Sequence, residues 1–436
     1  MVPNTFKIKA IQDFCQIIDC EHKTAPYVEK SDFLVVRTSN VKDGRLIWDD
    51  MKFTTQNGYE EWTQRAIPEY GDVLFTREAP AGEICLVPKD IKMCMGQRMV
   101  LLRPVPEKID PLYFSLVLTS KKIKLDILKI SIGSTVSRIN IEDIRQLKVP
   151  VPPLDEQRKI SKMLNAWEQA ILITEKLLTN SQRQKKALMQ QLLTGKRRFG
   201  WEGGYAYSVP QGYAKSKLGA LPSAWKVDLL EKHLWFQEGP GVRNHQFTET
   251  GIKLFNGTNI QFNKIDLTNT TTHISSEEAF GIYKHFLIDE GDLLIACSGI
   301  SVDRFNEKIA FALSSHLPLC MNTSTMRFKV LDNHILDIRY FQYFMQSLLF
   351  KNQIRRQATG SAQLNFGPSH VGKCFVVIPS IEEQQKIAAV LSAADAETFT
   401  LEKKLACLKD EKKALMQQLL TGKRRVKVEA EEAVSA

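Results

Sequence analysis

The sequence predicts a mixed α/β fold, in which two globular α/β domains are separated by two long antiparallel coiled-coil helices in an internal pseudo-twofold repeat. The first observation behind this prediction is the segment KKALMQQLLTGKRR, which occurs unchanged at Lys185–Arg198 and at Lys412–Arg425. The second is a coiled-coil spacing of apolar residues that leads into each copy. The third is a region of short β-rich runs before each helix. One unit of about 220 residues therefore occurs twice along the chain.

The repeat extends well beyond the two exact copies. Over Val151–Arg198, 24 of 48 residues are identical to the residues 227 positions later. Further upstream the likeness weakens and the offset drifts. The corresponding segments are Gly133-Ser134 with Gly360-Ser361, Asp110–Phe114 with Asp337–Phe341, Gly71–Phe75 with Gly291–Ile295, and Asn40 with Asn259. Divergent loops on a repeated scaffold predict two different recognition surfaces.

These boundaries divide the chain into five parts. Each repeat has a divergent front domain and a repeated helix, and a short acidic tail follows the second helix. We expect this tail to be disordered. The parts are residues 1–152 (first front domain), 153–199 (central helix), 200–378 (second front domain), 379–425 (distal helix) and 426–436 (tail).

The front domains alternate short β-rich runs with polar loops. Seven runs read as strands because they are rich in β-branched and apolar residues. They are Phe33–Arg37, Val73–Phe75, Glu83–Val87, Met99–Leu102, Leu293–Ala296, Ile309–Leu313 and Met326–Val330. Pro111–Leu128 and Ile338–Arg355 each predict one amphipathic helix.

The repeated parts predict helices of about 40 residues, or ~60 Å. Prolines precede each helix, and Gly195 and Gly422 end the two runs. Apolar residues at steps of three and four form a narrow seam, for which a helix of equal length is the best partner. An alternative is that each seam packs on its own front domain. We expect the helix-pair interface to include Ile160, Leu164, Trp167, Ile171, Leu178, Leu188, Leu192, Ile387, Leu391, Leu401, Leu405, Leu408, Leu415 and Leu419.

Charge distribution, apolar runs and cysteine spacing limit the classes of protein to which this chain can belong. The net charge is +10, but basic residues exceed acidic ones by only two in each front domain and by six in 153–199. We therefore expect neither front domain alone to bind a polyanion tightly. No apolar run is long enough to span a bilayer, and Met1–Lys23 does not read as a signal peptide. Eight scattered cysteines without a CxxC pair predict free thiols in a reducing cytoplasm.

Motifs for catalysis are missing from the sequence. There is no phosphate-binding GxxxxGK[ST] loop, no glycine-rich turn suited to a methyl donor, and no HxxxH or HxH spacing. Asp289, Glu290 and Asp292 lie beside a glycine turn and are better explained as a strand boundary than as metal ligands. We expect no catalytic site, no metal site and no cofactor in this chain.

The loops of both front domains carry residue types that contact DNA. Arginine suits guanine, and asparagine or glutamine suits adenine, while lysine and arginine also hold phosphates. Each has the alternative of being an ordinary surface residue. The candidate DNA-binding residues are Arg37, Lys42, Arg45, Lys52, Arg77, Arg98, Arg138, Arg243, Asn244, Asn259, Gln261, Lys264, Arg304, Asn306 and Asn322.

The pattern resembles the specificity subunit of type I restriction–modification systems. The motif Pro-x-x-x-Glu-Gln-x-x-Ile opens each helix and Leu-Leu-Thr-Gly-Lys closes it, and the resemblance covers essentially the whole chain. It implies two target-recognition domains, each reading one half of a split site in double-stranded DNA. It also implies that the helix pair sets the spacing and docks methyltransferase subunits, two of them expected. Small departures are Phe6 where the second repeat has Trp225, and the unmatched tail.

The resemblance further implies a chain that is not an enzyme by itself. Restriction/translocase subunits would complete the complex, and S-adenosylmethionine, ATP and Mg²⁺ would belong to partner subunits. The expected setting is a cytoplasmic bacterial defence system. Two other classes stay open: a scaffold whose front domains bind proteins, which DNA mobility shifts would exclude, and a self-contained nuclease or methylase, which would make product alone.

Overall fold

The computed structural model forms two compact units. Unit 1 combines Met1–Lys176 with Glu402–Ala436, and unit 2 is Leu177–Leu401. The structure describes residues 6–20, 23–131, 137–199, 207–208, 212–357 and 363–427. The repeated Gly133-Ser134 and Gly360-Ser361, and residues 428–436 of the expected disordered tail, lie outside these ranges.

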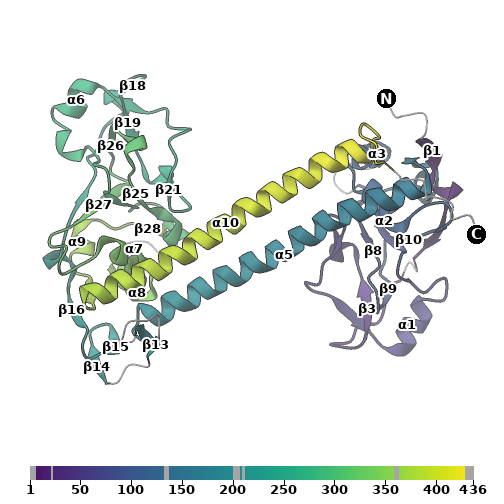
Figure 1. Cartoon of the computed structure of the whole chain (residues 1–436), viewed down its shortest axis with the longest axis horizontal. Coiled ribbons are helices and arrows are strands. Elements are labelled where there is room, and N and C mark those ends of the chain that lie inside the picture. The colour runs from purple at the N-terminus through teal and green to yellow at the C-terminus, as the bar shows by residue number, and fades with distance from the viewer. Residues whose placement is uncertain are drawn as a thin grey trace, which may run out of the picture. The chain divides into compact units, whose positions relative to one another are not determined.

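Unit 1 is built on two small sheets (Figure 1). A four-stranded antiparallel sheet has the order β2-β10-β7-β8, and a three-stranded sheet has the order β6-β3-β9 with β3 and β9 parallel. The pair β1–β11 and the hairpin β4–β5 complete the strands. Their bounds are β1 Lys7–Ala10, β2 Cys15–Asp19, β3 Phe33–Val36, β4 Val41–Lys42, β5 Arg45–Leu46, β6 Lys52–Thr54, β7 Val73–Thr76, β8 Ile84–Leu86, β9 Lys92–Met95, β10 Met99–Pro104 and β11 Lys148–Val151.

Unit 2 repeats the four-stranded sheet as β17-β27-β23-β25 and adds a sheet of order β18-β22-β19-β26. Its other strands form two-stranded pairs. The bounds are β12 Arg198–Phe199, β13 Tyr207–Ser208, β14 Tyr213–Ser216, β15 Gly219–Pro222, β16 Lys226–Leu229, β17 Leu234–Glu238, β18 Phe247–Thr248, β19 Ile252–Phe255, β20 Ile260–Gln261, β21 Lys264–Ile265, β22 His273–Ile274, β23 Leu293–Ala296, β24 Ile300–Ser301, β25 Ile309–Phe311, β26 Leu319–Met321, β27 Thr325–Val330, β28 Gln363–Leu364 and β29 Phe375–Ile378.

Each front domain has two short helices where the sequence predicted one. The first breaks because the Ser120 hydroxyl accepts a hydrogen bond from the Ile123 N–H and so starts a new helix. Ser347 lies at the second break, and its hydroxyl accepts one from the Phe350 N–H. The shorter helices are α1 Gln56–Trp62, α2 Pro111–Leu118, α3 Lys121–Ile130, α4 Ile141–Gln146, α6 Ser276–Phe280, α7 Ile338–Gln346, α8 Leu348–Gln357 and α9 Pro368–Val371.

The two long helices are α5, Leu154–Leu192, and α10, Ile381–Leu419. Each begins in one unit and ends in the other. In unit 1, Glu156 pairs with Arg425 and Glu168 with Lys412. Residue numbers therefore increase along α5 in the direction in which they decrease along α10. In unit 2, Lys185 likewise pairs with Asp395. The predicted antiparallel packing of the helices is therefore found within each unit.

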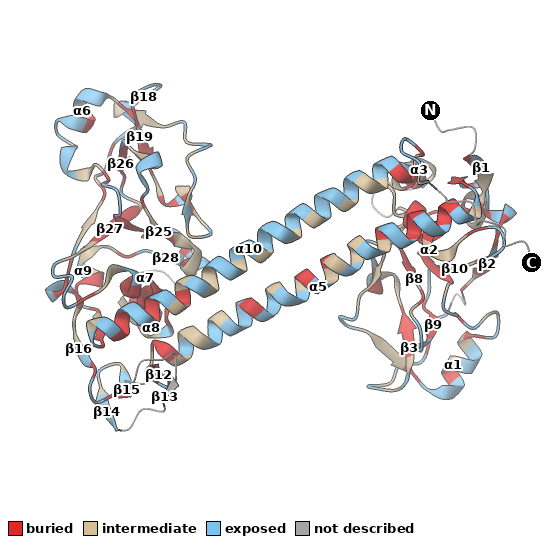
Figure 2. Ribbon diagram, in the orientation of Figure 1, coloured by how far each residue is buried: buried red, intermediate tan, exposed pale blue. Residues whose placement is uncertain are grey.

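The seam of the helices is buried to different degrees along its length (Figure 2). All fourteen expected interface residues are buried or half-buried. Ile160, Leu164 and Leu419 belong to the core of unit 1, and Ile387 and Leu391 belong to that of unit 2. The ends of the seam thus pack on front domains, as the alternative interpretation had it, while its intermediate part pairs helix with helix.

Candidate nucleic-acid interface

The repeated glutamine of each helix locks the helix to a front domain. Gln157 Oε1 accepts a hydrogen bond from the Asp110 N–H at 2.8 Å, and its Nε2 donates to the Pro152 carbonyl at 2.8 Å. Gln384 does the same with Asp337 and Pro379, at 2.9 Å each. These matching hydrogen bonds explain why the glutamine of the motif is repeated.

The repeated glutamate receives the arginine that ends the other helix segment. Glu383 accepts two hydrogen bonds from Arg198, at 2.8 and 2.7 Å, and Glu156 accepts two from Arg425, at 2.6 and 2.7 Å. Trp225 Nε1 also donates to Glu383, at 3.0 Å. We call these contacts the Arg198 clamp and the Arg425 clamp. They explain why Leu-Leu-Thr-Gly-Lys-Arg-Arg repeats: each copy closes a front domain.

Two candidate DNA-binding residues lie instead against the long helices. Arg45, in the β4–β5 hairpin, donates to Glu168 at 2.6 Å and to Glu175 at 3.0 Å, both on α5. Lys264, in the equivalent β20–β21 hairpin, lies with Nζ 3.7 Å from the centre of the Phe399 ring on α10. Both side chains brace a hairpin against the helix of their own repeat.

Other candidates hold loops in shape. Asn259 bonds to Asn256, Asp266 and Thr270, and Asn322 is buried with its side-chain oxygen on the Thr323 N–H. Arg37, Lys52, Arg304 and Gln261 also have partners within the chain, whereas Asn306 differs. Arg37 and Lys52 share Asp50, Arg304 bonds Glu307 and Gln261, and Asn306 Oδ1 is buried with no partner among the described residues.

Lys42, Arg243 and Asn244 are exposed. The described residues offer none of these three side chains an ion pair or side-chain hydrogen bond. They therefore stay available for an external ligand.

Three candidate arginines of unit 1 come together. Arg98 and Arg138 both pair with Glu78, at 3.2 Å each, and their side chains are 54% and 59% exposed. Arg77 is buried and pairs with Asp19 at 3.2 Å. We call these five residues the first loop cluster. A guanidinium has five N–H donors, so one shared carboxylate leaves Arg98 and Arg138 with donors for phosphate or guanine.

Three backbone hydrogen bonds recur in unit 2 and define the equivalent positions. Arg77 N to Arg98 O becomes Cys297 N to Ser324 O, and Ile139 N to Arg77 O becomes Phe366 N to Cys297 O. The third is Cys20 N to Met99 O, which becomes Gly239 N to Thr325 O. The second loop cluster therefore consists of Glu238, Cys297, Ser298, Ser324 and Asn365.

The two loop clusters differ in chemistry although their backbones match. The first has three arginines and two carboxylates, and the second has one carboxylate and neutral side chains. Ser298 donates to Asn365 Oδ1 at 2.9 Å, where the first cluster has the Glu78–Arg138 ion pair. The same scaffold thus presents a cationic surface in unit 1 and a neutral to acidic one in unit 2.

Residues that repeat between the front domains proved structural, as for Asn40 and Asn259, which fold equivalent turns. Residues that differ at equivalent positions are the better candidates for recognition. Sequence reasoning missed Glu78, Glu238 and Asn365 because the offset between the fronts drifts. Only the shared backbone hydrogen bonds show that these residues correspond to Ser298, Asp19 and Arg138, respectively.

The Asp289–Asp292 turn is structural, as the sequence predicted. Asp292 Oδ2 accepts the Asp289 N–H at 2.9 Å and pairs with Arg327 at 3.1 Å. Among the described residues, His, Cys, Asp and Glu form no group that could hold a metal ion. Within the same ranges, no helix has the length and apolar character needed to cross a membrane.

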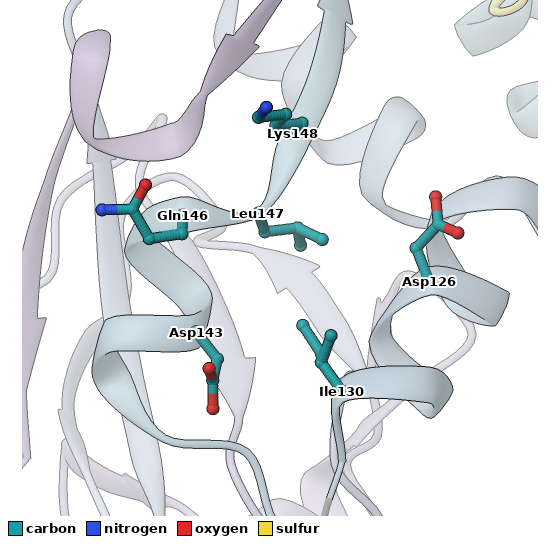
Figure 3. Close-up of a pocket in the computed structure, with 6 residues that line it drawn as sticks. All are labelled: Asp126, Ile130, Asp143, Gln146, Leu147 and Lys148. Carbon is teal, nitrogen blue, oxygen red and sulfur yellow. The ribbon is translucent and has the colours of Figure 1, made fainter.

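A small open pocket of about 260 Å³ lies between α3 and α4 (Figure 3). Ile130 and Leu147 line its interior, and its other lining residues are Asp126, Asp143, Gln146 and Lys148. None of these belongs to the first loop cluster. Its mixed lining combines no set of groups that specifies a ligand.

Comparison with known proteins identifies the family of this chain and proteins with a similar fold. The family model for the type I restriction modification DNA specificity domain matches residues 3–180 and 241–407. The MjaVIII type I restriction enzyme specificity subunit of Methanocaldococcus jannaschii is 26% identical over 348 residues, covering 80% of this chain and 77% of that one.

Solved structures agree with this family. The crystal structure of a type I S subunit from M. genitalium has a TM-score of 0.61 at 14% identity, covering 96% of this chain and 98% of that one. A chain from a study of type I R-M complex assembly and conformational transition has 0.54 at 17%, covering 97% and 100%. The chain belongs to the family of type I restriction–modification DNA specificity subunits.

Proposed function

We propose that this chain is the sequence-reading subunit of a restriction–modification complex in which unit 1 and unit 2 each read one half of a two-part DNA target. The observation that carries the proposal is the contrast between the two loop clusters. Their matching backbones would present the same geometry to a duplex. At the positions that Arg98 and Arg138 occupy in unit 1, unit 2 has Ser324 and Asn365. Different donors and acceptors at one position select different bases.

The helix pair has two roles in this proposal. It sets the spacing between the half-sites, and its outer surfaces dock methyltransferase subunits, two of them because the helices repeat. The repeated clamps and glutamine joints support this assignment, since they keep both helix ends identical while the loops diverge. Restriction/translocase subunits complete the complex, in the cytoplasm.

Catalysis belongs to the partners in this proposal. S-adenosylmethionine, ATP and Mg²⁺ act in partner subunits, and this chain supplies only DNA specificity.

The test is to map modified bases in DNA treated with the chain in complex with its methyltransferase subunits. We expect a motif of two short specified parts separated by a fixed unspecified gap. A continuous motif contradicts the two-reader arrangement. Absence of DNA binding by the complex favours the protein-scaffold alternative instead.

A further inference from the structure

Glu238 in unit 2 occupies the position of a carboxylate that is neutralised in unit 1. Its equivalent, Asp19, pairs with the buried Arg77, whose side chain is at 3.2 Å. In unit 2 the position of Arg77 is taken by Cys297, which brings no charge to balance Glu238. Glu238 is the last residue of β17, so both carboxylates lie at the same edge of equivalent sheets.

The carboxylate of Glu238 is half-buried and lacks a hydrogen bond or ion pair from any described residue. Burial raises the pKa of Glu238, and the electrostatic effect of His370 acts in the opposite direction. His370 Nδ1 already accepts the Gly367 N–H at 3.0 Å. Water can reach a half-buried carboxylate, and a donor group on a ligand can take the place of that water.

The carboxylate of Glu238 lies close to Gly367. A Cβ atom added to Gly367 would lie 3.0 Å from Glu238 Oε2, so the carboxylate rests against the glycine backbone. Gly367 lies two residues after Asn365, and Cys297 precedes Ser298. Asn365 and Ser298 are both exposed. The carboxylate therefore lies beside the segment that carries Asn365, and close enough to Cys297, the neighbour of Ser298, to act on it electrostatically.

We propose that Glu238 is a specificity-determining residue that accepts a hydrogen bond from the exocyclic amino group of a base in the half-site read by unit 2. This inference rests on the proposed function. A negative phosphate would be repelled, which leaves the donor groups on base edges. In the major groove these are N4 of cytosine and N6 of adenine, and a single carboxylate suits cytosine N4 best.

Asn365 and Ser298 belong to the same loop cluster as Glu238, the residue proposed to contact the base. Their hydrogen bond to each other and the bond from the Gly299 N–H to Asn365 Oδ1, at 2.8 Å, fix the amide orientation. The Asn365 amide hydrogens therefore remain as donors beside the carboxylate acceptor. Unit 1 lacks this acceptor, because Arg77 occupies Asp19.

The experiment selects bound sequences from a DNA library randomised in both half-sites, with the complex of this chain and its methyltransferase subunits. We compare wild type with Glu238→Gln, which keeps the side-chain size but can donate to an adenine N7. One position in one half should lose its cytosine preference or shift to adenine, with the other half unchanged. Affinity for the original site should fall on the order of 10- to 100-fold.

Glu290→Gln is the matched control, since Glu290 is an exposed carboxylate of the same unit with no ion pair among the described residues. Its selected motif should equal that of the wild type. Gly367→Ala is a second test, because it keeps the charge of Glu238 but displaces its carboxylate, and the same position should weaken.

The outcomes separate the two proposals. If the wild-type complex selects no two-part motif, the proposed function fails. If it does, and Glu238→Gln selects the same bases with equal affinity, the role of Glu238 fails while the proposed function stands. If the substitution lowers assembly with methyltransferase subunits and leaves base selection unchanged, Glu238 pairs with a partner protein and the inference is overturned. A cytosine or adenine at the affected position identifies which amino group is read.

Discussion

The Arg198 clamp gives a stability prediction that can be worked from its geometry. Glu383 is 8% exposed and accepts three hydrogen bonds, two from Arg198 and one from Trp225. Removing one partner of a buried ion pair costs roughly 3–5 kcal/mol. Because the Arg198 side chain is 17% exposed, water recovers part of this loss. We expect Glu383→Ala to destabilise unit 2 by about 2–4 kcal/mol.

A double-mutant cycle with Arg198→Ala isolates the pair itself. The expected coupling is about 2 kcal/mol, whereas the exposed pair Arg145–Glu142 should give under about 0.5 kcal/mol. Native-state hydrogen exchange of residues 193–197 and 226–230 measures the local opening free energy. Coupling as small as that of the exposed pair would refute the assignment of the repeated Glu and Arg as a clamp.

Three further predictions concern recognition, acid stability and spacing. Arg98→Gln combined with Arg138→Gln should weaken DNA binding by the complex by about 2–4 kcal/mol and change only one half of the selected motif, measured by library selection. The pKa values of Glu168 and Glu175 are lowered: burial acts to raise them, but the ion pairs with Lys412, Lys409 and Arg45 outweigh it. Their stabilisation is therefore complete above the ordinary glutamate pKa of about 4.3 and is lost as pH falls through the lower folded values. Hydrogen exchange of α5 amides should show this loss, and replacing both glutamates by glutamine should flatten it. Finally, one added heptad in both long helices lengthens each by about 10 Å, so the gap in the modified motif should grow by roughly three base pairs if the helices set spacing.

Much of the fold follows from the repeat itself. Steps of three and four require a narrow stripe on a helix, and Gly195 and Gly422 end the runs, so the long helices could be predicted closely. The break before Ser120 could not, because a serine cap competes with an amphipathic pattern that continues through it. Local propensity alone does not decide between them.

The candidate site was harder to predict for a physical reason. Arg45 and Arg98 are the same residue type in polar loops, yet Arg45 binds helix carboxylates and Arg98 remains over half exposed. Only tertiary packing distinguishes them. Glu238 could not be singled out from the sequence because an isolated carboxylate forms no motif. It becomes a candidate only by comparison with Asp19, which pairs with Arg77, whereas Glu238 has no arginine partner.

The division of the chain between the units also affects how the protein is made. Unit 2 is continuous in sequence, but unit 1 needs residues after 401 to complete its core, including Leu419 and Leu420. At 5–20 residues per second, a ribosome takes roughly 10 to 45 s to synthesise the intervening stretch. Throughout that time the nascent first domain exposes the apolar surface around Ile160 that awaits the final helix. A premature stop near the 3′ end of the message should therefore damage the domain synthesised first and spare the one synthesised second.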